Sequence, residues 1–456
     1  MEEREVVVIG GGLTGLVTAF WLRKKGVDAL IIEKDNKPGG VIRTAREQGF
    51  VYETGPNTGV LSHPEVAMLF DELETKCKLE PADRSAKKRL IWKNNCWHPL
   101  PSGLMEAIKT PLFSKTDKFR ILLEPFRKRG KDPFESLESM VKRRLGQSFL
   151  DYAIDPFISG IYAGDPSYLV PRYALPKLYA LEQKYGSFIK GAVMKRLEKK
   201  DEMEKKVTRE VFSVEGGLDN LTGALESEIG PQNIRTGVSG SVVTPFNNGY
   251  LISGNFRGKE LEVQAQYVIS TIGSFELAEL LPFLNRDELS LINNLKYSGV
   301  IQITMGFNNW KGVDMKAFGG LVPSIEKRDI LGILFPSSFL KKRAPDGGAL
   351  LSVFMGGYRN PEMLGLPDDR IIDLALKETA TMMQLDACEP DLLKLHRYKH
   401  AIPQYGMNSM QRIEAIVRLQ SEHRGLILAG NIHEGIGMSD RIRQGKRLAD
   451  HTAKAF

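Results

Sequence analysis

Three glycines close to the N-terminus constrain the fold of this chain more than any other feature. Gly10, Gly12 and Gly15 directly follow the apolar run Val6–Ile9, which is typical of a fully buried strand. A segment with helical spacing comes next, and a second apolar run, Asp28–Ile32, follows it. This order predicts a β-α-β unit in which the glycines form the turn from the first strand into the helix.

The spacing of these glycines fits a dinucleotide-binding turn. The first glycine permits a tight turn, the second lets the backbone approach a pyrophosphate, and the third lets helix pack closely on strand. The pyrophosphate then lies at the helix N-terminus, where free N–H groups favour negative charge. An acid at the end of the second strand is placed to accept ribose hydroxyls. The predicted contacts of this unit are Gly10, Gly11, Gly12, Leu13, Thr14, Gly15, Glu33 and Lys34.

Length and cysteine content limit the class of protein. A chain of 456 residues is too long for one ordinary core, which predicts two or three domains. The three cysteines, Cys77, Cys96 and Cys388, lie far apart, which argues against a disulfide framework and favours a reducing compartment. No secretory signal and no apolar stretch of roughly 20 residues is present. We therefore expect a cytoplasmic protein without a metal site, whose membrane contact, if it has any, is peripheral on the inner face.

The positive charge of the chain is unevenly distributed. Residues 115–144 carry ten Lys/Arg against five Asp/Glu, a local excess of 10 − 5 = +5, and residues 190–209 carry eight against four, or +4. On charge alone the pattern favours solvated helix faces, because Glu and Asp are interleaved throughout, and attraction to an anionic membrane is the alternative. No nucleic-acid-binding motif accompanies it, so nucleic acid is not an expected partner.

The segment after the second strand identifies the dinucleotide. Gly39-Gly40 followed by Arg43 resembles the extension of the glutathione-reductase-like and amine-oxidase-like FAD superfamily, although an ordinary Gly-Gly turn with a surface arginine is the alternative. Glu53-Thr54-Gly55-Pro56 matches the same superfamily, as does the C-terminal run Leu426–Asn431. The resemblance implies non-covalent FAD, with further contacts at Gly40, Val41, Arg43, Gly55, Pro56, Asn57, Thr58, Val243, Gly430, Asn431, Gly437 and Met438.

Two narrower motifs point to one family within this superfamily. Gly160–Pro166 and Lys399–Tyr405 resemble signatures of oxygen-dependent protoporphyrinogen oxidases, and the likeness extends from Glu5 to about Ala449. The resemblance implies an FAD enzyme that oxidises a porphyrinogen by six electrons, with molecular oxygen as acceptor and hydrogen peroxide as product. It also implies a helical, membrane-contacting domain, and leaves a homodimer or a transient contact with a chelatase open.

The resemblance and the strand pattern together give an expected architecture. We expect an α/β fold with a Rossmann-like FAD domain of the glutathione-reductase/amine-oxidase type, an α+β substrate domain and a mostly helical inserted domain. The FAD domain is predicted from residues 1–85, 208–295 and 425–456. The helical domain is predicted from residues 96–207, and the substrate domain from residues 86–95 and 296–424.

The family resemblance also nominates substrate contacts. A porphyrinogen is a large apolar ring with carboxylates at its rim, so it needs an apolar slot with a cation at the mouth. The positions carried over are Arg89 for a propionate, and Phe157, Gly160, Phe318, Leu321 and Phe354 for the ring. Without the resemblance, Arg89 reads as a surface strand residue and the aromatic residues as core. No catalytic side chain is assigned, because the flavin itself accepts the hydride.

Three alternatives remain open from the sequence. Coproporphyrinogen III carries four carboxylates where protoporphyrinogen IX carries two, and Lys87, Lys88 and Arg89 suit either substrate. Protoporphyrinogen IX is our first expectation. A flavin amine oxidase or desaturase shares the FAD skeleton, but no cysteine follows Cys388 for the covalent flavin link of many amine oxidases. The third alternative is a protein that binds and carries a porphyrin without oxidising it.

Overall fold

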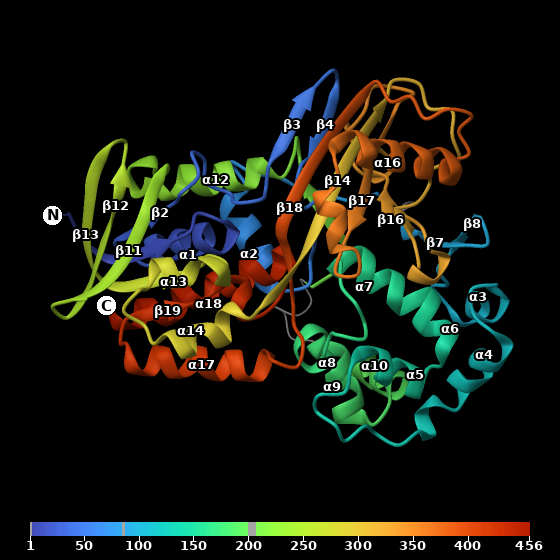
Figure 1. The fold of residues 1–456 in the computed structure, drawn as a ribbon, viewed down its shortest axis with the longest axis horizontal. Helices are drawn as coiled ribbons and strands as arrows, with labels where there is room; N and C mark the ends of the chain where they lie inside the picture. Colours follow the sequence, from blue (N-terminus) through green and yellow to red (C-terminus); the bar gives the residue numbers. More distant parts are fainter. Residues whose placement is uncertain (1, 84–86, 199–206) are drawn as a thin grey trace.

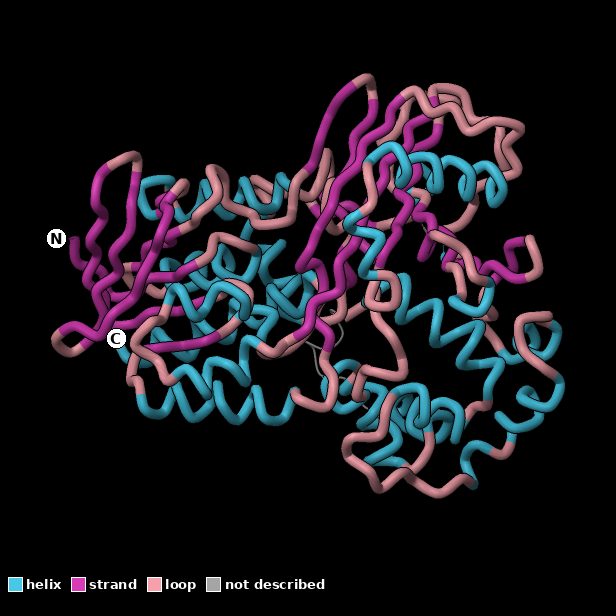
Figure 2. The backbone as a smooth tube through the Cα atoms, in the orientation of Figure 1, coloured by secondary structure: helices cyan, strands magenta, loops and turns pink. Residues whose placement is uncertain are grey.

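The computed structural model describes residues 2–83, 87–198 and 207–456. Figure 1 shows a sheet that lies near both chain termini, a second sheet beside it, and a cluster of helices below the second sheet. Figure 2 shows that the strands belong mainly to the two sheets, whereas the cluster is almost entirely helical. The mixed α/β architecture therefore confirms the predicted fold class.

The first sheet is assembled from segments that are distant in the sequence. Its strand order is β10-β2-β1-β13-β12-β11. The seventh strand, β19, lies outside this linear order and pairs with β13. Strands β10, β2, β1, β13 and β19 are parallel, and β11 and β12 are antiparallel additions. Its strands are β1 (Glu2–Ile9), β2 (Ala29–Ile32), β10 (Ile234–Arg235), β11 (Val238–Phe246), β12 (Gly249–Phe256), β13 (Lys259–Ser270) and β19 (Leu426–Leu428).

Helices cover both faces of this sheet, as parallel strands require. Packed in one hydrophobic cluster are α1 (Leu13–Lys24), α2 (Pro64–Leu73), α12 (Asp219–Ile229) and α18 (Met438–Thr452). Packed in the other are α13 (Leu277–Leu280), α14 (Arg286–Asn293) and α17 (Ser409–Glu422). The predicted β-α-β unit is confirmed as β1-α1-β2, and the last four residues of β1 are all buried.

The second sheet is mostly antiparallel, with the order β18-β14-β17-β16-β15-β7-β8. Helix α16 (Asp368–Met383) shares a hydrophobic cluster with one face of it (Figure 1). Only β15 and β7 pair in parallel. Its strands are β7 (Arg89–Lys93), β8 (Cys96–Pro99), β14 (Lys296–Phe307), β15 (Gly319–Leu321), β16 (Ile330–Leu334), β17 (Ala349–Gly356) and β18 (Leu392–Gln404).

Two small sheets complete the strands. The hairpin β3 (Thr44–Glu47) and β4 (Phe50–Glu53) packs Phe50 and Tyr52 against Leu350 and Leu392 of the second sheet. The other small sheet has the order β5-β9-β6, formed by β5 (Gly59–Val60), β9 (Val211–Val214) and β6 (Leu79–Pro81). The hairpin thus ties the first fifty-odd residues to the second sheet.

Between residues 104 and 197 the chain is mostly helical, as its periodicity predicts, whereas Cys96–Pro99, at the start of the range predicted for the helical domain, forms strand β8 of the second sheet. Two of the prolines in this helical region, which interrupt the helical periodicity of the sequence, are the first residue of a helix, Pro171 in α8 and Pro176 in α9, where the missing N–H costs little. The helices are α3 (Leu104–Lys109), α4 (Lys115–Leu122), η2 (Glu124–Phe126), α5 (Leu137–Arg144), α6 (Gln147–Phe149), η3 (Leu150–Ile154), α7 (Asp155–Tyr162), α8 (Pro171–Ala174), α9 (Pro176–Tyr185) and α10 (Phe188–Leu197).

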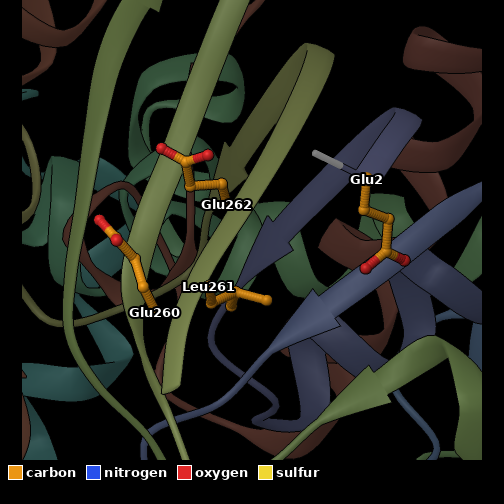
Figure 3. A pocket seen from close by; sticks show the side chains of 4 residues that line it. All are labelled: Glu2, Glu260, Leu261 and Glu262. Atoms are coloured by element: carbon orange, nitrogen blue, oxygen red, sulfur yellow. The ribbon is translucent and has the colours of Figure 1, made fainter.

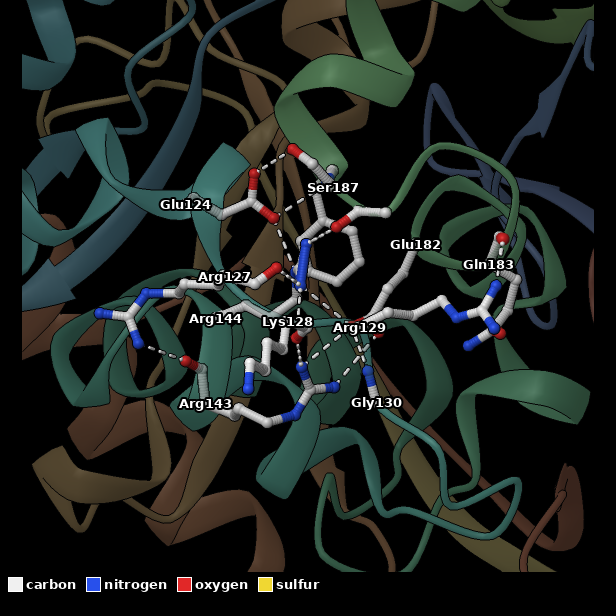
Figure 4. A network of polar contacts seen from close by, with 12 residues as sticks. Glu124, Arg127, Lys128, Arg129, Gly130, Arg143, Arg144, Glu182, Gln183 and Ser187 are labelled. Atoms are coloured by element: carbon white, nitrogen blue, oxygen red, sulfur yellow. Dashed lines mark hydrogen bonds and ion pairs between the residues drawn. The ribbon is translucent and has the colours of Figure 1, made fainter.

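A buried charge network holds these helices together (Figure 4). Arg144 donates to the Glu124 carboxylate at 2.6 Å and to the Glu182 carboxylate at 3.0 Å, and all three side chains are almost fully buried. Ser187 and the backbone N–H of Phe188 also donate to Glu124. Arg144, one of the basic residues expected on a helix surface, is therefore buried and paired inside this helical region.

Strand β18 was not predicted from the sequence. Its thirteen residues include the Lys399–Tyr405 motif, but most of its side chains are half-buried and give no apolar periodicity, because β18 is an edge strand. Helix α17 falls in the range predicted for the substrate domain, yet it packs on the first sheet. The predicted boundaries near residue 85, and residues 199–206 of the second basic stretch, lie outside the described residues. The division into three domains stays a prediction.

The remaining helical turns are short: η4 (Pro231–Asn233), η5 (Ser274–Glu276), η6 (Ser324–Glu326), α15 (Pro336–Phe339), η7 (Pro361–Gly365), η8 (Gly430–Ile432) and η9 (Ala453–Ala455). None of the helices among residues 2–83, 87–198 and 207–456 is both long and apolar enough to cross a bilayer.

Candidate active site

The glycine loop closes tightly at the carboxyl end of β1. Gly10 adopts a φ of +102° and its N–H donates to the carbonyl of Ile32 at 2.8 Å. A Cβ added to Gly15 would lie 2.0 Å from the carbonyl oxygen of Gly10. Only glycine at this position lets α1 approach β1 so closely, as the sequence predicted.

The start of α1 leaves space and donors for an anion. Gly12 is the N-cap residue in an extended conformation, no side chain caps the helix, and a Cβ on Gly12 would meet nothing within 4 Å. The buried hydroxyl of Thr14, in the first turn, has no hydrogen-bond partner among the described residues. Free N–H groups, an open approach and an orphaned hydroxyl fit a pyrophosphate group.

Glu33 lies beside this loop and helps to shape it. Its carboxylate accepts the N–H of Gly11 at 2.6 Å and the N–H of Asp35 at 2.8 Å. Each oxygen retains capacity for a further donor, such as a ribose hydroxyl. Lys34 instead forms an ion pair with Glu276, and this bond raises the pKa of Lys34.

The structure does not bring Val243 close to the glycine loop and Glu33. Val243 is fully buried in β11, where it pairs with Ile252 of β12. Val238 lies beside Glu33 instead, because its N–H donates to the Glu33 carbonyl at 3.0 Å. The structure thus favours Val238 over Val243 as the neighbour of Glu33, because β11 starts directly after the turn at Gly237, and the contact of Val243 with FAD stays a prediction.

Two predicted segments converge on the glycine loop. A Cβ on Gly40 would lie 3.3 Å from the Cα of Gly12, and a Cβ on Gly55 would lie 2.0 Å from the carbonyl of Val41. Arg43 donates to the carbonyls of Pro38, Ile42 and Lys37, so it holds its own loop. This holding role of Arg43 was not predicted from the sequence.

The segment 53–58 joins the first sheet to the second. Gln302 donates to the carbonyl of Glu53 at 2.7 Å, Ser352 donates to the side chain of Asn57 at 3.2 Å, and Tyr398 donates to the carbonyl of Thr54. Pro56 and Thr58 lie half-buried in this segment. The sequence analysis did not predict that Gln302, Ser352 and Tyr398 contact this segment. Gln302, a polar residue within an apolar strand, was the one available signal.

Thr271 connects the glycine loop to the C-terminal segment. Its hydroxyl contacts the carbonyls of Ile9 at 3.1 Å and Gly10 at 3.0 Å, and its own carbonyl lies 2.8 Å from the Cβ position of Gly430. Asn431 accepts the hydroxyl of Tyr297 at 3.1 Å. All of these residues therefore gather at the carboxyl ends of parallel strands, where ligands bind in open α/β sheets.

The last helix begins at the same place. Gly437 is the N-cap of α18, its N–H donates to the Asp440 carboxylate at 3.3 Å, and Met438 is buried as the first helical residue. Three separated parts of the chain thus supply the predicted cofactor contacts, with Val243 as the exception.

Two of the predicted ring contacts, Leu321 and Phe354, lie in one row across the second sheet. Leu321 pairs with Gly332, Gly332 pairs with Phe354, and Phe354 pairs with Gln302. Paired residues on adjacent strands share a face, and this is the face opposite the α16 cluster. Gly160 of α7 covers the row, because a Cβ there would lie 2.4 Å from Leu321 Cδ2.

Arg89 stands at the edge of this face. Its guanidinium lies 5.6 Å from the centroid of the Phe318 ring, and Phe318 packs on Phe339 with centroids 4.4 Å apart. Burial lowers the pKa of Arg89. No carboxylate of the described chain pairs with it. A half-buried cation without a counter-charge suits an anionic ligand.

Phe157 is less closely tied to the row. It lies one turn before Gly160 on α7, with its ring 6.1 Å from that of Tyr162, and packs against the hydrophobic cluster on the α17 side of the first sheet.

A surface pocket elsewhere is unrelated to this group. It lies at the amino end of β1 and on β13, lined by Glu2, Glu260, Leu261 and Glu262 (Figure 3). The glycine loop follows the opposite end of β1, and three carboxylates are an unsuitable lining for a phosphate-bearing cofactor.

Comparison with known proteins shows the family of this chain. Residues 13–452 match the family model of flavin containing amine oxidoreductases. The chain is 27% identical to the mitochondrial protoporphyrinogen oxidase of Nicotiana tabacum, over 98% of this chain and 94% of that protein. It is 28% identical to the protoporphyrinogen oxidase of Homo sapiens, over 98% of each chain. The resemblance inferred from the motifs is confirmed.

Solved structures share the fold over the whole chain. A candidate protoporphyrinogen oxidase from Exiguobacterium sp. 255-15 aligns with a TM-score of 0.81 at 22% identity, covering 100% of this chain and 99% of that one. A reduced UDP-galactopyranose mutase aligns with a TM-score of 0.74 at 17% identity, covering 99% and 96%.

Gly12 and Gly15 allow a test that separates cofactor binding from folding. We expect Gly12→Ala to leave the thermal stability of the apoprotein unchanged and to weaken FAD binding at least about tenfold, because its methyl group occupies the space of the pyrophosphate. Gly15→Ala should lower the free energy of unfolding by about 1–3 kcal/mol or more through its clash with Gly10. Fluorescence titration with FAD and thermal melts measure both. Unchanged FAD affinity in Gly12→Ala would place the pyrophosphate elsewhere.

Glu53 gives a prediction on pH. Burial raises its pKa to about 7, against hydrogen bonds from the N–H of Leu218 and the hydroxyl of Thr44 that act to lower it. Between pH 4.5 and 7 the unfolded state releases this proton while the folded state keeps it. Stability from this group is therefore complete below pH 4.5, falls by about 3 kcal/mol as pH rises to 7, and is level above that.

The measurement is urea unfolding at several pH values for the wild type and Glu53→Gln. The difference in unfolding free energy between the two proteins should change across this window, because glutamine does not titrate. A constant difference from pH 5 to pH 8 would show that Glu53 is already ionised in the folded protein.

Proposed function

Because the chain belongs to the family of flavin containing amine oxidoreductases and takes FAD as its cofactor, we propose that it oxidises protoporphyrinogen IX to protoporphyrin IX. Molecular oxygen is the proposed acceptor and hydrogen peroxide the proposed product. The observation that carries this proposal is Arg89, a cation that pairs with no carboxylate of the described residues and lies on the same face of the second sheet as the Leu321–Phe354 row. The near full-length likeness to protoporphyrinogen oxidases supports it.

The residues of this chain have three tasks in the proposed reaction. The glycine loop, Glu33 and the segments around Gly55 and Asn431 hold FAD, which when bound accepts a hydride from a bridging carbon of the substrate. Leu321 and Phe354 receive the apolar ring and exclude water, and Gly160 lets α7 pack closely on Leu321.

Arg89 pairs with a rim propionate, and its partial burial strengthens that pairing relative to a surface site. Positioning of the bridging carbon follows from fixing one edge of the ring while the apolar face holds the rest. No side-chain base is proposed, because a pyrrole proton can pass to solvent.

The choice of protoporphyrinogen IX over coproporphyrinogen III rests on the number of cations. Arg89 is the one predicted substrate contact that carries a charge, and a substrate with four carboxylates needs a more cationic site. Lys87 and Lys88 precede Arg89 in the sequence and keep coproporphyrinogen III as the second candidate.

Anaerobic mixing with each porphyrinogen tests reaction and substrate together. We expect protoporphyrinogen IX to bleach the visible absorbance of the bound flavin, and air to restore it with formation of fluorescent porphyrin. Comparison of kcat/KM for the two porphyrinogens decides between them. Failure of both to bleach the flavin would contradict the proposal and favour an amine oxidase or a carrier.

Substitution of Arg89 tests the propionate contact. Arg89→Leu should raise KM about tenfold or more with a smaller change in kcat, because it removes a charge-assisted hydrogen bond made in the bound state. Arg89→Lys should restore part of the affinity. Arg257→Leu is the matched control, since Arg257 also stacks on a phenylalanine, at 4.9 Å from the Phe256 ring, in a distant strand turn. Equal KM values for Arg89→Leu and the control would remove Arg89 from the site.

We also propose that the helical region rests on an anionic membrane surface. Ten large apolar side chains are exposed on α3, α4, α10 and the adjoining η2 segment, interleaved with Lys and Arg, which suits insertion between lipid headgroups. They are Met105, Ile108, Phe119, Leu122, Leu123, Phe126, Ile189, Val193, Met194 and Leu197.

Flotation with vesicles tests this contact. The protein should bind vesicles of phosphatidylglycerol and phosphatidylcholine at low salt, and Phe126→Ser should weaken binding about tenfold, because Phe126 is 84% exposed. Val417→Ser, an exposed apolar position on α17, is the control and should bind as the wild type does. Absence of flotation with the wild type would contradict the proposal.

A further inference from the structure

Three side chains anchor the loop 431–436 by donating hydrogen bonds to its backbone carbonyl groups. The hydroxyl of Tyr405 donates to the carbonyls of Asn431 at 2.8 Å and Gly435 at 3.0 Å. Arg412 donates through Nε to the carbonyl of Ile432 at 2.9 Å, and Arg441 donates to the carbonyl of Glu434. These three side chains thus form hydrogen bonds with four of the five backbone carbonyls of residues 431–435.

This arrangement fixes the direction of the N–H groups of the loop. In a trans peptide the C=O of one residue and the N–H of the next point in opposite directions, and no cis peptide occurs among the described residues. The N–H groups of Gly435 and Ile436 therefore point away from Arg441 and Tyr405. Neither N–H has a hydrogen-bond partner among the described residues.

The free side of the loop lies among the predicted FAD contacts. Gly430 packs on Thr271, whose hydroxyl contacts the glycine loop. At the other end of the loop, Ser439 donates to the carbonyl of Val60, and His63 contacts the Asp440 carboxylate at 3.1 Å. The loop therefore lies between the turn for the pyrophosphate and the segment that follows Gly55.

Two of the three anchors carry positive charge that no carboxylate of residues 2–83, 87–198 and 207–456 neutralises by an ion pair. Arg412 is fully buried against the Tyr405 ring, at 5.5 Å from its centroid, and one of its terminal nitrogens has no partner. Arg441 Nε is likewise buried without a partner. The nearby acids are engaged elsewhere, because Glu434 and Asp440 pair with Arg443 at 3.3 Å and 3.8 Å. A buried guanidinium without a counter-charge is costly unless the bound state supplies one.

We propose that Tyr405 and Arg441 are positioning residues that aim the N–H groups of Gly435 and Ile436 at the flavin, and that the buried charges of Arg412 and Arg441 favour the negative charge the flavin gains on reduction. Hydride acceptance adds two electrons and one proton to the flavin, which leaves a net negative charge in its ring system. The buried guanidiniums stabilise that charge in a water-poor site, and the anchored N–H groups provide preorganised donors. The proposal depends on FAD as the cofactor and not on the identity of the substrate.

The test measures the flavin itself, without any porphyrinogen. Holoprotein is reduced chemically against a reference dye to obtain the two-electron midpoint potential, and FAD affinity is measured by fluorescence. Arg412→Met should lower the equilibrium constant for flavin reduction about tenfold, which is a shift of about 30 mV toward more negative potential. Arg412→Lys should recover part of this shift, because it retains the charge.

Two further variants separate positioning from stability. Tyr405→Phe keeps the ring beneath Arg412 but removes the hydroxyl that holds two carbonyls, so it should weaken FAD binding about fivefold or more and lower the potential less than Arg412→Met does. Arg418→Met is the matched control, since Arg418 lies on the same helix, is half-exposed and pairs with Glu288. It should leave potential and affinity unchanged.

Wild-type potential in Arg412→Met holoprotein would overturn the charge assignment, even if the thermal stability of that variant falls. Unchanged FAD affinity and potential in Tyr405→Phe would overturn the positioning role of the loop anchors. Both outcomes are independent of porphyrinogen turnover, so failure of this inference and failure of the proposed function remain distinguishable.

Discussion

The close approach of α1 to the end of β1 is the contact on which the rest of the site depends. Gly15 allows it, because any side chain there would collide with the carbonyl of Gly10. The approach brings the first turn of the helix to the carboxyl edge of the parallel strands, where β13 and β19 also end. Thr271 and Gly430 then reach the glycine loop, although they lie more than 250 residues away in the chain.

The second sheet is joined to this edge by polar contacts from strand side chains. Gln302, Ser352 and Tyr398 all contact the segment 53–57, which places the opposite side of the same sheet from α16 next to the cofactor segments. The Leu321–Phe354 row and Arg89 both lie on that face. The proposed reaction follows from this juxtaposition, because a ring held on the row and a flavin held by the loop share one boundary.

The local parts of the site were predictable from the sequence. The glycine turn, its flanking strands and Glu33 follow from short-range spacing, and the family resemblance supplied Gly160, Leu321 and Phe354, which pair or pack as neighbours. Val238 rather than Val243 lies beside Glu33, because strand register depends on where β11 begins. Strand β18 went unpredicted because an edge strand needs no apolar alternation, and the anchors Tyr405, Arg412 and Arg441 act on backbone carbonyls, which leave no sequence pattern.

The sequence by itself determined the cofactor class, the α/β fold and the helical character of residues 104–197, because each depends on periodicity and on residue types within one segment. Only the tertiary structure decided which distant groups meet: Thr271 with Gly10, Gly160 with Leu321, and Arg412 with the carbonyl of Ile432. The physical reason is that sheet order and loop packing set these contacts, and both arise from burial of the whole chain rather than from any local preference.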